Sequence, residues 1–69
     1  MSKPLIVTPK TGDAYIHRKS GGKYIVVCIA LEEATEKPVV VYRGVETQTT
    51  WTRPLEEFMD GRFVSEFGE

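Results

Sequence analysis

The order of hydrophobic and polar residues along the chain is typical of short β-strands separated by tight turns. Residues that alternate between two faces, or that are β-branched and aromatic, gather in four stretches. These predicted strands are residues 14–17, 23–31, 39–43 and 48–53. Residues 62–67 alternate weakly, and the pattern leaves open whether they form a closing strand or a loop.

The segments between the predicted strands carry turn residues. Ser20-Gly21-Gly22-Lys23 predicts a tight hairpin turn, because glycine reaches positive φ without a steric penalty. Residues 32–37 form a charged loop, and residues 44–47 turn the chain into its second hairpin. The long stretch 23–31 is apolar on both faces, which in so short a chain predicts a bent strand that passes from one sheet to another.

The eight residues from Trp51 to Phe58 mark the end of the last predicted strand. Pro54 has no backbone N–H, so it is unsuited to a central strand and well suited to the first turn of a helix. Leu55 and Phe58 are three residues apart and lie on one face of that turn. We therefore expect both side chains in the core, where they close the end of a small barrel.

These elements predict an all-β fold: a small, strongly bent SH3-like barrel of four or five strands with one short helical turn after Pro54. A two-layer sheet with one helix is the alternative, if residues 31–37 prove helical. Residues 1–12, interrupted by two prolines, predict an irregular N-terminal arm, and residues 13–69 a single barrel domain. A chain of 69 residues buries only about 60% of its unfolded surface, too little to enclose a large active site.

Charge and cysteine content narrow the classes of function. The net charge is −1, although basic residues predominate in the first third of the chain, which permits a local basic patch without a generally cationic surface. Cys28 is the only cysteine and lies in an apolar run, so a disulfide framework and a multi-cysteine zinc site are excluded. With no apolar stretch long enough for a membrane span or a signal peptide, we expect a soluble, cytoplasmic protein.

Residue types that carry catalysis are sparse. Cys28 and the single His17 could form a nucleophile pair on paper. The favoured interpretation is structural: Cys28 is a buried small hydrophobe, and His17 is a strand residue hydrogen-bonded near the turn. Residues 20–23 suggest phosphate binding only superficially, because the spacing and following helix of a P-loop are missing. We predict no enzyme, no metal and no cofactor.

Aromatic and basic residues together form the most functional-looking set. Exposed aromatic rings on a strand surface stack bases, hold a peptide proline or surround a cation, and basic neighbours bind phosphate or carboxylate. The predicted binding residues are Tyr15, His17, Lys19, Lys23, Tyr42, Arg43, Trp51 and Arg53. A purely structural role competes with this hypothesis, because Tyr15 and Trp51 also suit a small core with their polar ends at its rim.

Several of these residues occur in an ordered set that resembles a small bacterial and phage domain family of unknown function, number sixteen fifty-three in its series. The set comprises Tyr15-x-His17, Lys19, Gly21-Gly22, Tyr24-x-Val26, Val40-Val41-Tyr42 and Trp51-x-Arg53-Pro54-Leu55-x-x-Phe58. The resemblance covers about residues 12–58, with small length differences in two turns, where length is well tolerated. It implies the fold and a phage or prophage origin, and it supplies no activity.

The sequence therefore predicts a non-enzymatic binding module that presents one aromatic and basic face. A protein or peptide partner is favoured, because an acidic overall balance weakens the attraction for phosphates on which nucleic-acid binders depend. Nucleic acid is one alternative partner. Sequestration of a small anionic ligand by the turn at residues 19–23 is another. No membrane contact is expected, and the sequence does not predict an oligomeric state.

Overall fold

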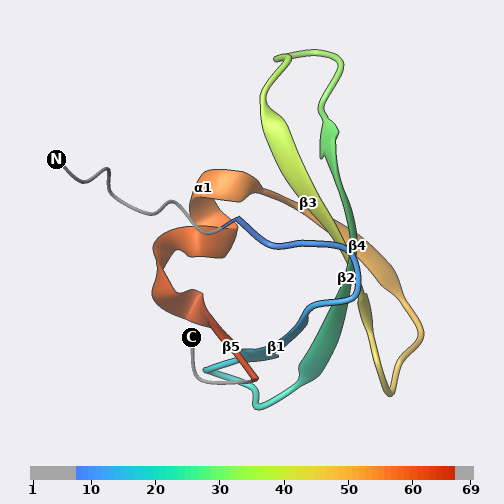
Figure 1. Cartoon of the computed structure of the whole chain (residues 1–69), viewed down its shortest axis with the longest axis vertical. Coiled ribbons are helices and arrows are strands. Elements are labelled where there is room, and N and C mark those ends of the chain that lie inside the picture. The colour runs from blue at the N-terminus through green and yellow to red at the C-terminus, as the bar shows by residue number, and fades with distance from the viewer. Residues whose placement is uncertain (1–7, 67–69) are drawn as a thin grey trace, which may run out of the picture.

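The computed structural model describes residues 8–66, which form one five-stranded antiparallel sheet and a short helical segment (Figure 1). The strands are β1 (Ala14–His17), β2 (Lys23–Leu31), β3 (Pro38–Gly44), β4 (Thr50–Pro54) and β5 (Phe63–Ser65). Between β4 and β5 lie α1 (Leu55–Glu57) and a wider π-type turn, η1 (Phe58–Arg62). No helix in this part of the chain is long and apolar enough to span a membrane.

Strand order confirms the predicted fold class. The sheet runs β4-β3-β2-β1-β5, so the last strand returns to pair with the first. The helical segment follows Pro54 as predicted and covers the concave side of the bent sheet (Figure 1). The chain is thus a small, strongly bent, all-β SH3-like barrel of five strands. The uncertain stretch 62–67 contains the closing strand β5, and Phe67 lies outside the described residues.

The N-terminal arm predicted for residues 1–12 is described only from residue 8 onward. Residues 8–12 contain no helix or strand, but they pack on the barrel. Pro9 is fully buried, and the backbone N–H of Gly12 donates to the carbonyl of Val26 at 2.8 Å. This end of the arm is therefore fixed to the sheet beside β2.

The long strand β2 bends within a single sheet, and the predicted passage between two sheets is wrong. Its pairing with β3 shifts register between Val26 and Cys28, which marks a β-bulge. Val26 lies in the core with 1% of its surface exposed, whereas Leu31 is 69% exposed. Beyond the bulge the side chains of β2 become more exposed, and the far end of the β2–β3 hairpin projects from the barrel (Figure 1), although Val40 of β3 stays in the core and β3 stays paired with β4.

Cys28 lies in this projecting part and is exposed, so its predicted burial is wrong. The apolar run that contains Cys28 indicated a core strand, but the core covers the strand only as far as the bulge.

Because of this exposure, we expect Cys28 to react with a thiol reagent in the native protein. Labelling in dilute solution at neutral pH should approach the rate measured for the urea-unfolded chain, since access no longer limits the reaction. Protection by several orders of magnitude would show that Cys28 is covered.

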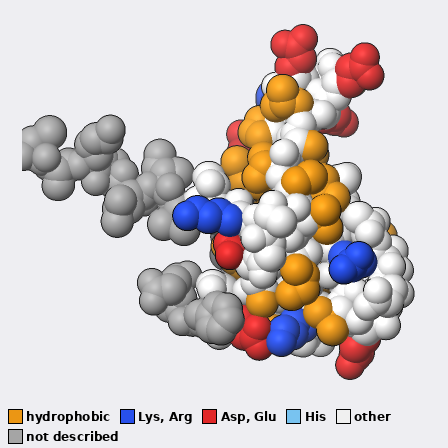
Figure 2. All heavy atoms as spheres, turned by 45° about the vertical axis from the view of Figure 1, so that its right-hand side comes forward, with side chains coloured by type: hydrophobic (Ala, Val, Ile, Leu, Met, Phe, Trp, Pro, Cys, Tyr) orange, Lys and Arg blue, Asp and Glu red, His pale blue; other side chains and the backbone are white. Residues whose placement is uncertain are grey.

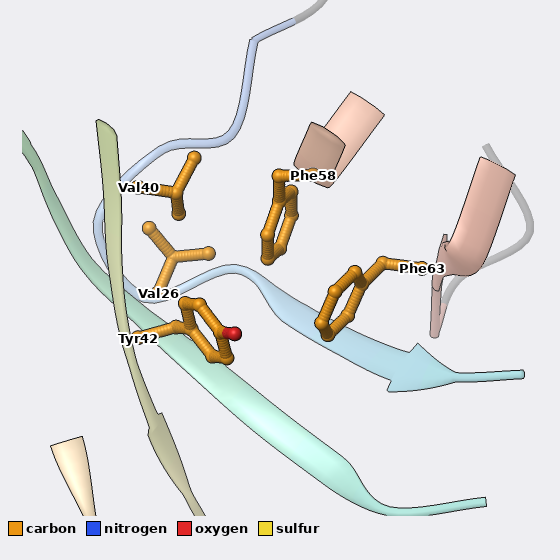
Figure 3. Packing of buried hydrophobic residues seen from close by; sticks show 5 residues of the cluster. All are labelled: Val26, Val40, Tyr42, Phe58 and Phe63. Carbon is orange, nitrogen blue, oxygen red and sulfur yellow. The ribbon is translucent and has the colours of Figure 1, made fainter. Parts of the chain in front are cut away.

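The core lies between the concave side of the sheet and the helical segment (Figure 3). It contains Val26, Val40, Tyr42, Phe58 and Phe63. The rings of Phe58 and Phe63 stack with their centroids 4.3 Å apart, and Leu55 packs against the cluster. The predicted core position of Phe58 is confirmed, and Leu55 packs against the core while staying partly exposed.

Gly61 lets the chain turn from η1 into β5. Its φ of +106° lies in a region that side chains with a Cβ rarely adopt, and this conformation brings Phe63 back onto Phe58.

A Gly61→Ala substitution should destabilise the protein by about 1–2 kcal/mol. A Cβ at this position meets no atom within 4 Å, so backbone strain is the whole of the expected effect. Gly61→Asn should be milder, because asparagine tolerates positive φ better than alanine. Urea denaturation of the three proteins measures the difference. An alanine variant as stable as the parent would contradict the strained conformation.

Candidate binding site

A pocket of about 310 Å³ lies on the concave side of the sheet, next to the aromatic end of the core. Its walls come from all five strands or the turns between them. The lining residues are His17, Ser20, Tyr24, Tyr42, Trp51, Arg53 and Phe63. We call this site the aromatic pocket. Its volume is at the lower end of the range for ligand sites, which suits one or two side chains of a partner.

Strand β4 supplies two of the lining residues from its inward face. Trp51 pairs with Tyr42 and Arg53 with Val40 across the antiparallel ladder. Directly paired residues point to the same side of a sheet, so Trp51 and Arg53 share the face of the buried Tyr42 and Val40. The pairing therefore places Trp51 and Arg53 on the inward face of β4.

The aromatic rings of the pocket have different degrees of burial. Tyr42 is 5% exposed and makes edge contacts with Tyr24 and Phe63, with ring centroids 5.4 Å apart in both pairs. Trp51 is 49% exposed even though its strand position faces inward. The buried rings therefore form a rigid floor, and Trp51 forms a wall that remains open to solvent.

Arg53 is held in place by three neighbours. Its Nε donates a hydrogen bond to the hydroxyl of Tyr42 at 3.3 Å, and its Nη1 lies 3.4 Å from Oε1 of Glu57. The guanidinium carbon is 5.7 Å from the ring centroid of Phe63, within reach of a cation–π attraction. The side chain is 28% exposed, so part of the guanidinium still faces solvent at the pocket.

His17 is oriented by the turn that follows β1. The backbone N–H of Ser20 donates to Nδ1 of His17 at 3.4 Å, and the Ser20 hydroxyl lies 3.1 Å from the same nitrogen. Since a backbone N–H can only donate, Nδ1 is the acceptor and the ring proton belongs on Nε2. The ring also packs on Phe63, with centroids 4.9 Å apart. The prediction that His17 is hydrogen-bonded near the turn is confirmed.

Comparison with known proteins places the chain in a family. The model of one protein family, described as Protein of unknown function (DUF1653), matches residues 13–66. The chain belongs to DUF1653. No curated protein and no solved structure matches it. The DUF1653 match extends beyond the resemblance noted at residues 12–58 and includes β5 with Phe63.

Four of the eight predicted binding residues in this DUF1653 domain meet at the aromatic pocket: His17, Tyr42, Trp51 and Arg53. Tyr15 packs against the core instead, with the centroid of its ring 5.0 Å from the centroid of the Phe58 ring. Burial, together with the nearby charge of Asp13, raises the pKa of the Tyr15 hydroxyl.

The predicted basic residues do not gather on one face. Arg43 is exposed and follows the inward-facing Tyr42 along β3, so it points to the opposite side of the sheet. Nζ of Lys23 lies 2.9 Å from a carboxylate oxygen of Glu66. Lys19 is exposed in the turn after β1 and forms no ion pair with any residue from 8 to 66. Among residues 8–66, Arg53 is the only lysine or arginine that lines the pocket.

Three lining residues were absent from the predicted set: Ser20, Tyr24 and Phe63. Tyr24 carried a usable signal, because it lies two residues before Val26 on the core face of β2. Phe63 enters the pocket through pairing with His17 between the two ends of the domain. That long-range register leaves no mark on the local sequence.

Groups for metal or acid-base chemistry do not converge in the described part of the chain. Residues 8–66 contain no cluster of three or more histidine, cysteine or acidic side chains able to hold a metal ion. None of the described acidic residues lines the aromatic pocket, and Cys28 lies outside its lining. The arrangement can hold and orient a ligand through ring faces, one guanidinium and the hydrogen-bonding groups of His17 and Ser20.

Proposed function

We propose that this DUF1653 chain is a non-enzymatic binding module whose aromatic pocket holds an apolar side chain of a protein or peptide partner. The observation that carries the proposal is Trp51, which is half exposed on the inward face of β4 above a floor of buried rings. Aromatic residues of this kind, rigid and open on one side, are the usual anchors of peptide and protein interfaces.

The chemistry of the partner follows from the polar part of the pocket. Arg53 already shares its guanidinium with Tyr42 and Glu57, yet remains partly exposed. The exposed part of the guanidinium can therefore donate hydrogen bonds to one additional carboxylate. His17, whose proton belongs on Nε2, can donate to a carbonyl or carboxylate oxygen. The best-fitting partner segment has a proline or aromatic side chain with a carboxylate close by.

Charge placement favours such a segment over nucleic acid. Sequence-independent binding of phosphates needs several lysines or arginines along one surface. Here Arg43 lies on the opposite face of the sheet from Tyr42, Lys23 pairs with Glu66, and Arg53 is partly neutralised by Glu57. Nucleic acid is the second candidate, because Lys19 is exposed and directly precedes the lining residue Ser20.

The turn at residues 20–22 offers little to a small anion. Its three backbone N–H groups already donate within the chain: Ser20 to Nδ1 of His17, Gly21 to the carbonyl of His17, and Gly22 to the Ser20 hydroxyl. An anion would have to displace these hydrogen bonds, which orient His17. The proposal therefore gives the turn a positioning role.

The proposed setting is the cytoplasm of a bacterium or its phage, as a soluble protein without a cofactor. It is supported by the single, unpaired Cys28, which suits a reducing compartment, and by the resemblance stated for the sequence motifs.

A display library of random peptides tests the proposal, with single-stranded RNA and DNA as competing probes. Trp51 is the only tryptophan, so its fluorescence reports occupancy of the pocket directly. We expect enrichment of peptides with a proline or aromatic residue next to an acidic one. Their affinity should depend weakly on salt, because one ion pair at most is formed.

Binding of nucleic acid would depend on salt in a different way. Single-stranded nucleic acid should lose affinity with a log-log slope of about 0.7 per phosphate contacted. Tight, salt-steep binding that disappears when Lys19, Lys23, Arg43 and Arg53 are neutralised, together with no enriched peptide, would replace the proposed partner with nucleic acid.

A further inference from the structure

The hairpin that projects from the barrel carries exposed hydrophobic side chains. Val27, Ile29 and Leu31 of β2 are 39%, 40% and 69% exposed, and Cys28 between them is also exposed. Figure 2 shows hydrophobic side chains along this projection and acidic ones at its tip. Neither the helical segment nor the N-terminal residues 8–12 extends over it (Figure 1). Exposed apolar surface of this extent on a small domain indicates an interface.

One backbone edge of the same segment has no neighbouring strand among residues 8–66. The pairing of β1 with β2 ends at Ile25. The chain before β1 continues the contact only as far as Val27, whose carbonyl accepts a hydrogen bond from the Thr11 hydroxyl at 2.9 Å. No described strand lies beside residues 28–31 on that side of the sheet. A free apolar edge is a template for an added strand.

Opposite charges lie at the two ends of this free edge. Lys10 is exposed next to Thr11, where the edge begins, and forms no ion pair with any residue between 8 and 66. Glu32 and Glu33 are exposed directly after β2, where the edge ends. In an antiparallel pair of identical strands, Glu32 and Glu33 of each copy would lie beside Lys10 of the other copy.

We propose that two copies of this chain associate through residues 28–31 of β2, antiparallel across a two-fold axis. Such an interface uses the same patch on both copies, so the Lys10–Glu33 attraction occurs twice. It also covers Ile29 and Leu31 of both chains and joins the two sheets into one. A parallel arrangement would bring acidic end against acidic end. The proposal is independent of the aromatic pocket and does not rest on the proposed function.

Analytical ultracentrifugation of the full chain over a wide concentration range is the first test. We expect the mass to rise with concentration from 7.8 kDa towards twice that value. Ile29→Lys should keep the protein monomeric, because it puts a charge into the paired edge. Val45→Lys is the matched control, since Val45 is 41% exposed in the turn after β3, and it should associate like the parent.

Charge reversal tests the orientation. Lys10→Glu and Glu33→Lys each place like charges together in a dimer of identical copies, so each variant alone should be monomeric under conditions in which the parent is dimeric. An equimolar mixture should form a heterodimer, because both contacts are then complementary. Both residues are exposed, and the described hydrogen bonds and ion pairs do not use their side chains. Circular dichroism confirms that the variants fold.

Three results would overturn the proposal. The parent could stay monomeric at the highest concentration, or its dimer could persist in Ile29→Lys. The mixed charge variants could also fail to associate while each alone dimerises like the parent. A monomer whose amides at residues 28–31 resist hydrogen exchange would show instead that another segment of the same chain covers the edge.

Discussion

Replacing Phe58 with alanine is expected to destabilise the protein by about 3–5 kcal/mol, the usual loss for truncating a buried phenylalanine. Phe58 is 1% exposed, stacks on Phe63 and contacts the rings of Tyr15 and Tyr42. Its removal leaves a cavity where the helical segment closes the barrel. A domain of this size has only a few kcal/mol of net stability, so the variant should be largely unfolded or should melt far below the parent.

Met59→Ala is the matched control for this substitution. Met59 is the next residue in the same turn and is 43% exposed, so its truncation should change stability by less than about 1 kcal/mol. If Phe58→Ala is too unstable to measure, Phe58→Leu retains most of the volume and should fall between the two. Equal melting temperatures for Phe58→Ala and Met59→Ala would contradict the central position of Phe58 in the core.

The second large effect is expected for Trp51→Ala in peptide binding. A half-exposed tryptophan that anchors an interface typically contributes 2 kcal/mol or more, so affinity for an enriched peptide should fall by about 30-fold or more. Stability should change little by comparison, because Trp51 is 49% exposed and makes no ring contact with the aromatic core of the described chain. Isothermal titration calorimetry measures the affinity of both proteins without relying on tryptophan fluorescence.

Val45→Ala serves as the control for Trp51→Ala, since Val45 is exposed to a similar degree and does not line the pocket. Its peptide affinity should equal that of the parent. Arg53→Lys adds a third comparison: the charge is kept, but the flat guanidinium above Phe63 is lost. Selective loss of affinity for acidic peptides in Arg53→Lys would support the assigned carboxylate contact. Full affinity in Trp51→Ala would remove the main argument for the pocket.

Local patterns in the sequence were sufficient to predict the strands, the turns and the helical segment. Alternation and β-branched residues place β1 to β4 within a few residues of their observed ends. Pro54 starts the helical segment, and the spacing of Leu55 and Phe58 puts both against the core. These features depend on neighbours within one or two turns of chain, and therefore the sequence displays them directly.

Features that depend on long-range pairing were missed or left open. The bulge after Val26 exposes Cys28, and an apolar run gives no sign of where the core stops covering a strand. Phe63 reaches the pocket because β5 pairs with β1 at the other end of the domain. The sequence supplied the residue types of such contacts but not their register.

The same reasoning explains why the candidate site was predicted only in part. His17, Tyr42, Trp51 and Arg53 meet because adjacent strands place them on one face. Arg43 was grouped with them by composition, although alternation from Tyr42 points it to the opposite side of the sheet. Lys23 was counted as a free basic residue, but it pairs with Glu66, a partner 43 positions away in the chain.

The most direct test of peptide recognition by the aromatic pocket is a nuclear magnetic resonance titration of the ¹⁵N-labelled chain with an enriched peptide. The single indole N–H of Trp51 gives one isolated signal. We expect this signal to shift together with the amides of β4 and of the turn at residues 18–22, while those of the loop at 32–37 remain unchanged. Shifts confined to other parts of the chain, with the Trp51 signal unmoved at saturation, would contradict the proposed function.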